Sequence, residues 1–157
     1  MVTMALADLI TTERIALLAE PVDRDSVLDA AARLLADAAP HATTTIADSL
    51  RQRERLGSTA IGHGVAIPHG RSKAFGDARG AFLRLLTPVE FDAADGEPVD
   101  LVFAIAVPEG FSQQHLQLLS ELAERFADSG FRERLRRAGD AGALCSTLLG
   151  ADAQAAR

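Results

Sequence analysis

Residues 99–107 read VDLVFAIAV and contain the longest apolar run of the chain, from Leu101 to Val107. The larger side chains, at every second position from Val99 to Val107, lie along one face, and the smaller Val102, Ala104 and Ala106 give the other face an apolar surface as well. Because both faces are apolar, this pattern predicts a central strand that is buried on both sides. The run is far shorter than the roughly 18 apolar residues that a membrane-spanning helix needs. No membrane insertion is therefore expected.

Further elements are predicted on both sides of this strand. Apolar alternation predicts strands at 14–19 and 80–86, and Asp95 with Gly96 predicts a turn before residue 99. Helical spacings predict five segments: a helix over 25–38 capped by Asp25 or Ser26, one from Thr44 or Thr45 to Gly57, one from Ser112 through Phe126, and two over 131–138 and 142–149. The expected fold class is α/β with α+β layering, a small mixed sheet flanked by helices.

Length and composition indicate a single domain. The chain has 157 residues, of which 48% are hydrophobic and 24% are charged, as is typical of a globular protein. We expect one domain over residues 1–150 and a disordered tail over residues 151–157. The first residues lack the basic start and unbroken apolar core of a secretory signal, so a cytoplasmic location is expected. The single cysteine, Cys145, permits no internal disulfide and is expected in the core.

The charge distribution argues against nucleic acid as a partner. The net charge is −6, and the chain has neither Trp nor Tyr, the best residues for stacking on bases. Residues 51–84 nevertheless hold seven basic and two acidic residues, a net of +5, which leaves −11 elsewhere. Such a basic segment fits either solvated helix faces and loops or an anion site.

The glycine-rich segment from Gly57 to Gly70 reads GSTAIGHGVAIPHG, a composition that excludes a helix and favours short strands. Within it, His69 follows Pro68, which lacks an N–H, and precedes the unrestricted Gly70. A neutral imidazole, with an ordinary pKa of about 6.5, can offer a lone pair to phosphorus, a proton or a metal. The alternative is a structural histidine that is bonded to the backbone.

Two other residues have the chemistry to bind an anion near such a histidine. His115 falls in the first turn of the helix predicted after Ser112, where the helix dipole favours anions and a neutral ring can donate to a phosphate oxygen. Arg53 carries a permanent, forked cation that suits phosphate, whereas Arg51 and Arg55 are expected to face solvent. The plainer alternatives are a core or capping histidine at 115 and an exposed helix charge at 53.

Together these motifs resemble a known family. The resemblance rests on the glycine-rich segment, on RQRER at 51–55, on TPVEFDAADGEPVDLVFAIAVP at 87–108 and on FSQQHLQLLSELAERFAD at 111–128. These stretches are similar to the IIA domain of the mannitol and fructose class of the bacterial sugar phosphotransferase system. The likeness covers residues 5–149 and is greatest to the stand-alone nitrogen-regulatory branch of that class.

The resemblance implies a phosphocarrier with the mannitol/fructose-type IIA fold. A histidine phosphoprotein similar to HPr would donate a phosphoryl group to the histidine of the PHG motif, which is His69. The second active-site histidine of the family matches His115, and its phosphate-side arginine matches Arg53. The nitrogen branch implies signalling to regulatory targets such as kinases, potassium transporters or sensor proteins. The resemblance implies neither cofactor nor metal, and a component of a phosphotransferase relay rather than a free-standing enzyme.

Some residues of the basic and glycine-rich segments have no assigned part in this site. His63 stands where nitrogen-branch relatives have a small polar residue, and an exposed turn residue is the expected role. An extension of the phosphate site or of the donor interface is the alternative. Arg71 and Lys73 lie in a segment that varies in such proteins, and they are carried as candidate electrostatic contacts.

Three alternative functions remain open at this stage. A sugar-transport IIA component of the fructose or mannitol class would pass its phosphate to a IIB domain, although residues 1–157 contain no such domain. A zinc hydrolase could use His63, His69 and His115 as ligands, but the chain has no HExxH motif. A pure binding module would accept no phosphate at all.

Overall fold

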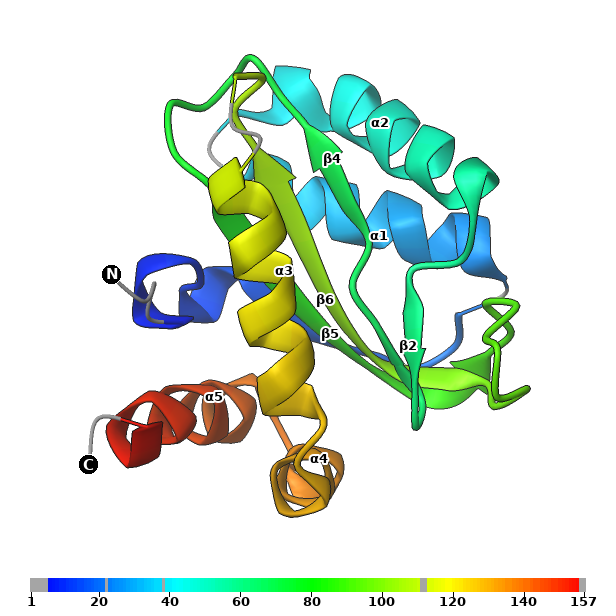
Figure 1. Ribbon diagram of the computed structural model, residues 1–157, viewed down its shortest axis with the longest axis vertical. Helices are drawn as coiled ribbons and strands as arrows, with labels where there is room; N and C mark the ends of the chain where they lie inside the picture. Colours follow the sequence, from blue (N-terminus) through cyan, green and yellow to red (C-terminus); the bar gives the residue numbers. More distant parts are fainter. Residues whose placement is uncertain (1–5, 22, 38, 111–112, 156–157) are drawn as a thin grey trace.

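The structure is a computed structural model that describes residues 6–21, 23–37, 39–110 and 113–155, with the backbone alone for residues 113–115 and 151–155. Its sheet is built around β6 (Val99–Val107), which pairs antiparallel with β5 (Arg79–Val89) (Figure 1). β1 (Ile15–Leu18) extends that side, parallel to β5. The predicted strands at 14–19, 80–86 and 99–107 are thus confirmed.

The glycine-rich segment forms the other side of the sheet. β6 pairs in parallel with β3 (Val65–Ala66) near its own start and with β4 (His69–Arg71) near its end. β2 (Ala60–Gly62) closes this edge, antiparallel to β3. The prediction of short strands without a helix in this segment is confirmed, and the sheet is mixed, as expected.

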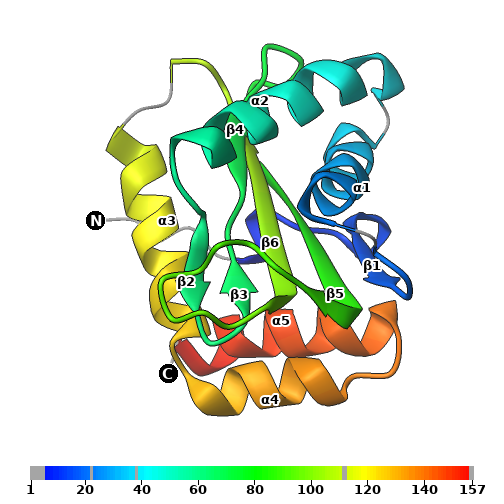
Figure 2. The same cartoon turned by 90° about the vertical axis from the view of Figure 1, so that its right-hand side faces the viewer.

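Helices cover both faces of the sheet (Figures 1 and 2). α1 (Arg24–Ala36) and α2 (Thr43–Leu56) pack against Val102, Ala104 and Ala106 of β6. Side chains of α3 (Gln113–Phe126), α4 (Ser129–Arg137) and α5 (Ala141–Ala155) pack against the opposite face, over Leu101, Phe103 and Ile105. A short 3-10 turn at Leu6–Asp8 adds Leu6 to the apolar layer beneath α3, α4 and α5. A second 3-10 turn, at Thr12–Arg14, leads into β1, and a third, at Pro40–Ala42, links α1 to α2.

Three local predictions are wrong. Val99 packs in the α1 and α2 cluster rather than beside Leu101, because the β5–β6 ladder shifts register between Val99 and Leu101. The cap of α1 is Asp23, whose carboxylate accepts from the Ser26 N–H at 2.8 Å. No hydroxyl caps α2, which follows directly on the Pro40–Ala42 turn; the Thr45 hydroxyl donates to the Ala42 carbonyl instead.

The C-terminal helix differs from the sequence expectation in two details. α5 runs to Ala155, into the stretch predicted as a tail, while residues 156–157 lie outside the described residues; the domain end at residue 150 stays a prediction. Cys145 is half-buried rather than in the core, and its sulfur accepts a hydrogen bond from the Thr12 hydroxyl at 3.4 Å. Within the described part of the chain, none of the helices has both the length and the apolar character that crossing a membrane requires.

Candidate functional site

A close approach between β4 and α2 positions His69. Ile67 and Pro68 connect β3 to β4 along the same edge of β6, and His69 then pairs opposite Ile105. A Cβ added to the next residue, Gly70, would lie 2.6 Å from the Ser49 hydroxyl and 3.2 Å from the Leu50 nitrogen, both on α2. Because glycine alone has no Cβ, it lets the strand pack this tightly against the helix. The imidazole therefore lies beside the last turn of α2.

Two hydrogen bonds define the tautomer of the His69 ring. Nδ1 lies 2.9 Å from the Ile67 carbonyl oxygen, and Nε2 lies 3.1 Å from Arg53 Nε. A carbonyl oxygen only accepts and a guanidinium only donates, so the neutral ring carries its proton on Nδ1. The lone pair is on Nε2, on the side of the ring that faces Arg53. This is the arrangement of a nucleophilic imidazole with an adjacent cation.

The surroundings of His69 favour the neutral ring. Burial lowers the pKa of the imidazole, and the nearby positive charge of Arg53 lowers the pKa further, although the bond to the Ile67 carbonyl raises it. Both lowering effects act by disfavouring a second positive charge in a partly desolvated place. The pKa therefore lies below the ordinary value of 6.5, and the lone pair is available at neutral pH.

Arg53 is held in the last turn of α2, where a cation complements the helix dipole. Its Nη1 donates to the Gly57 carbonyl oxygen at 2.9 Å, while Nε contacts His69. The guanidinium therefore bridges the Gly57 carbonyl oxygen, at the end of α2, and the His69 imidazole. The structure brings Arg53 and His69 together, so the alternative of an exposed helix charge at 53 is wrong.

A pocket of 460 Å³ opens at this contact. It is lined by Ser49, Gln52, Arg53, Leu56, His69, Gly70 and Arg71. A neighbouring pocket of 760 Å³ shares Ser49, Gln52 and Arg71 with it and also contains Lys73. Leu56 is 85% exposed at the rim, an unusual position for a large apolar side chain. Both pockets are open to solvent, so a binding partner can reach the contact between His69 and Arg53.

The arginines on either side of Arg53 behave differently from one another. Arg55 is exposed, as predicted. Arg51 does not face solvent: it forms ion pairs with Asp25, Asp29 and Asp48, the first two on α1. The prediction for Arg51 is wrong because the packing of α1 against α2 brings carboxylates to it, which the sequence pattern alone does not reveal.

The remaining predicted histidines lie at other positions. His115 is the third residue of α3, as its helical prediction requires, but its side chain lies outside the described residues. His63 is exposed in the β2–β3 turn with a φ of 58°, and its N–H donates to Asp95 at 2.9 Å. β3 starts opposite Leu101 and β4 opposite Ile105, so this turn, which precedes β3, lies at least four residues, or about 13 Å, from His69 along β6. The described residues include no group of three or more His, Cys, Asp or Glu side chains arranged to hold a metal.

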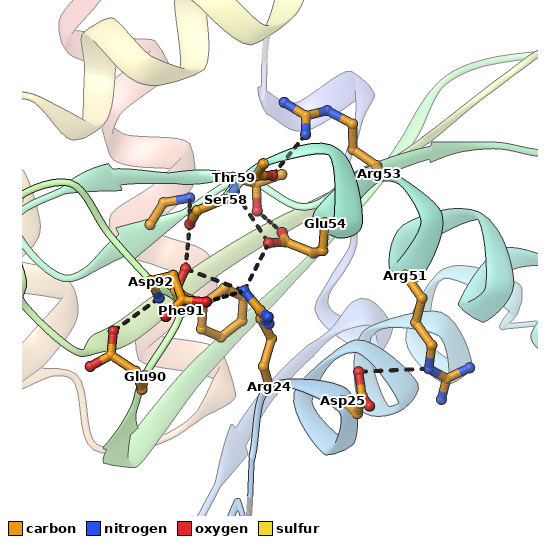
Figure 3. Close-up of polar contacts among 12 residues, drawn as sticks. Arg24, Asp25, Arg51, Arg53, Glu54, Ser58, Thr59, Glu90, Phe91 and Asp92 are labelled. Carbon is orange, nitrogen blue, oxygen red and sulfur yellow. Dashed lines mark hydrogen bonds and ion pairs between the residues drawn. The ribbon is translucent and has the colours of Figure 1, made fainter.

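Sequence reasoning missed the polar residues behind this contact. Glu54 is only 6% exposed, and its carboxylate accepts hydrogen bonds from the backbone N–H and the hydroxyl of Thr59. Figure 3 shows Glu54 between Thr59 and Arg24, close to Arg53. One signal was present in the sequence: an acidic residue within a basic run at a helix C-terminus, where the dipole disfavours it.

The chain belongs to the family described as the phosphoenolpyruvate-dependent sugar phosphotransferase system, EIIA 2, whose model matches residues 8–150. A nitrogen regulatory protein of Bradyrhizobium diazoefficiens is 37% identical over 145 residues, which cover 92% of this chain and 95% of that protein. The resemblance inferred from the motifs is thereby confirmed.

Solved structures agree with the family and the fold. The nitrogen regulatory protein IIA-Ntr of Neisseria meningitidis has 37% sequence identity and a TM-score of 0.82, covering 91% of this chain and 98% of that one. The Escherichia coli mannitol IIA in a complex with phosphorylated IIB has 20% identity and a TM-score of 0.71, covering 90% of this chain and 97% of that one. The latter likeness shows the fold alone. The predicted mannitol-type IIA fold is confirmed.

The lowered pKa of His69 yields a pH prediction. In an NMR titration, the His69 imidazole is expected to titrate below pH 6.5 because burial and Arg53 disfavour its protonation. The unfolded chain then binds this proton more readily than the folded one. The contribution of His69 to stability is therefore fully present above pH 6.5 and is lost as the pH falls through the folded-state pKa. A titration midpoint above 6.5 would contradict this environment.

Proposed function

We propose that this protein is a phosphocarrier of a phosphoenolpyruvate-dependent relay, which accepts a phosphoryl group on Nε2 of His69 from an HPr-like protein. The observation that carries the proposal is the pair of bonds that hold a neutral His69 with its proton on Nδ1 and its lone pair toward Arg53. Family membership over residues 8–150 supports the same reaction class. The relay would operate in the cytoplasm, without a cofactor.

The transfer step follows from this geometry. The Nε2 lone pair attacks phosphorus, and a new N–P bond forms while the P–N bond of the donor breaks. The donor ring, protonated on its other nitrogen, takes back the electron pair of that bond and leaves as a neutral imidazole. Nδ1 of His69 keeps its proton throughout, and the Ile67 carbonyl stabilises the positive charge that develops on the ring.

Arg53 supplies the countercharge. Phosphoryl transfer passes through a loose and strongly anionic transition state, so a protein contributes mainly alignment and positive charge. On attack, the Arg53 Nε–H loses its acceptor at Nε2 and becomes a donor to a phosphoryl oxygen. His115, in the first turn of α3, would orient the phosphate from the helix N-terminus.

A protein donor rather than a small molecule fits the rim of the site. Leu56 is exposed beside the pocket that contains His69, where a protein surface could cover it. Arg71 and Lys73 line the neighbouring pocket and would contribute attraction to an acidic partner surface. After transfer, the surface carries about 1.5 to 2 additional negative charges, which changes the partners that bind there.

Regulation is the favoured outcome of this change. The nitrogen regulatory relative matches nearly its whole length to this chain, which supports a regulator with targets such as kinases, potassium transporters or sensor proteins. The alternative is a sugar-transport component that passes phosphate to a IIB domain, a partner named for the mannitol IIA structure.

Intact mass after incubation with phosphoenolpyruvate, the first enzyme of the relay and its histidine carrier tests the central proposal. The wild-type chain is expected to gain one acid-labile phosphoryl group, which peptide mapping places on His69. His69→Ala is expected to gain none because the nucleophile is gone. Labelling of His69→Ala equal to that of the wild type would overturn the assignment, and an unlabelled wild type would favour a pure binding module.

The contribution of Arg53 is testable against its neighbour. Arg53→Ala is expected to slow labelling by about 100-fold, the typical effect of removing one donor to a transition-state anion. Arg55→Ala, which removes an equal charge from an exposed position two residues away, is the matched control and should label like the wild type. The rates are measured by quenched-flow labelling with the phosphorylated donor. Equal loss in both variants would mean that only general charge matters.

Affinity capture from cell extract separates the two outcomes. His69→Ala mimics the unphosphorylated surface, and His69→Glu adds a negative charge at the same place. If the charge state controls a regulator, the two baits should retain different kinases, transporters or sensors, identified by mass spectrometry. Retention of a IIB protein by both baits, without a difference in any other protein, would favour sugar transport.

A further inference from the structure

The buried carboxylate of Glu54 is the least expected feature near the site. Its side chain is 3% exposed and lies in the last turn of α2, adjacent in sequence to Arg53. A carboxylate there is unfavourable both because it is desolvated and because the C-terminal end of a helix is negative. A carboxylate that is buried here needs hydrogen-bond donors that replace the lost water, and two other segments of the chain provide them.

The donors come from two other segments. The Thr59 N–H lies 3.3 Å from Glu54 Oε2, and the Thr59 hydroxyl donates to Oε1. Arg24, the first residue of α1, has Nη1 3.8 Å from Oε2 and 3.4 Å from an Asp92 carboxylate oxygen. Figure 3 shows Glu54 reaching from the end of α2 to both partners. Glu54 thus ties α2 to the start of α1 and to the chain just after Gly57.

One chain of contacts leads from Glu54 to Arg53. The Gly57 N–H donates to the Glu54 carbonyl oxygen at 3.1 Å, and the Glu54 side chain holds Thr59, two residues further on. The short segment between these anchors is therefore restrained at both ends. Its Gly57 carbonyl oxygen is the acceptor for Arg53 Nη1 at 2.9 Å. Restraining this segment restrains the guanidinium.

A second chain of contacts leads from Thr59 to the imidazole. The Ile67 N–H donates to the Thr59 carbonyl oxygen at 3.0 Å. The Ile67 carbonyl oxygen in turn accepts from His69 Nδ1 at 2.9 Å, the bond that sets the tautomer. Thr59 is therefore common to the two chains of contacts, one ending at the cation and the other at the nucleophile.

We propose that Glu54 is a positioning residue, which acts through Thr59 to hold the Arg53 guanidinium and the His69 imidazole in register. This inference rests on the proposed function for its effect on rate, and on the contacts alone for its effect on the ring. The Glu54 side chain bonds to Thr59 and pairs with Arg24, and it acts on the site through them. Displacement of a reacting group by about 1 Å can cost on the order of 100-fold in rate, so a residue at this branch point affects transfer without contacting it.

The test compares variants at Thr59, because truncating the buried Glu54 could disrupt folding. Thr59→Val removes the hydroxyl donor while keeping the shape, and Thr59→Ser keeps the hydroxyl. Ile15→Val, on β1 at the far side of the sheet, deletes one buried methylene and serves as the control for lost stability. Glu54→Gln keeps the shape of the side chain but replaces one of its two acceptor oxygens with a donor and removes the charge that faces Arg24, so it tests the carboxylate itself.

Two measurements are made on each variant. Nitrogen-15 chemical shifts of the His69 ring report the fraction of neutral imidazole with its proton on Nδ1, and they need no donor protein. Labelling by the phosphorylated donor reports the rate. Thr59→Val and Glu54→Gln are each expected to shift the tautomer population toward Nε2–H and to slow labelling about tenfold or more. Thr59→Ser and Ile15→Val should retain the wild-type tautomer and most of the rate.

Failure of the positioning proposal can be told apart from failure of the phosphocarrier proposal. A wild-type tautomer population in Thr59→Val overturns the positioning proposal, and so does a Thr59→Val labelling rate equal to that of the wild type. Matching losses in Ile15→Val also overturn it, because they would reflect stability alone. If the wild-type chain accepts no phosphoryl group, the phosphocarrier function fails, and the ring spectra still decide whether Thr59 and Glu54 set the tautomer.

Discussion

Burial of β6 on both faces governs how the other elements of this molecule are arranged. Each side chain from Leu101 to Val107 is buried, so layers of side chains must cover the strand from two directions. The helices α1 and α2 cover one face, and the packing of α3, α4 and α5 covers the other. Its two edges must also be paired, since a buried strand cannot leave its N–H and carbonyl groups without partners. β5 fills one edge, and β3 with β4 fills the other.

The site is a consequence of how the second edge is filled. β3 and β4 each pair with only part of β6, and Ile67 and Pro68 join them along the same edge. The Ile67 carbonyl oxygen therefore lies within reach of the ring of His69, two residues later. Glycine at position 70 then allows β4 to approach α2. These features of the backbone place the His69 imidazole against the Arg53 guanidinium.

Electrostatics around this contact are local rather than global. The chain carries a net charge of −6, and residues 51–84 are basic in sequence. In the fold, several of these basic side chains bond to groups other than His69. Arg51 is paired with three aspartates, Arg79 donates to the Leu35 carbonyl oxygen, and Arg84 donates to the Ala138 carbonyl oxygen. Arg53 is the cation in contact with His69. The lowered pKa of the imidazole depends on burial and on this placement, not on the total charge of the segment.

Residue patterns alone predict the layered mixed sheet, the central strand and the family, because apolar periodicity and the PHG motif are local properties of the chain. They also single out His69 and Arg53 by chemical type. Packing between elements sets the tautomer of His69, the contact between its Nε2 and Arg53, the pairing of Arg51 with α1, and the burial of Glu54 against Thr59. Each of these joins residues from different elements, and their distances depend on packing, for example the approach that Gly70 permits. A pattern of residue types records periodicity along the chain, whereas a hydrogen bond across elements depends on tenths of an ångström that the whole fold sets.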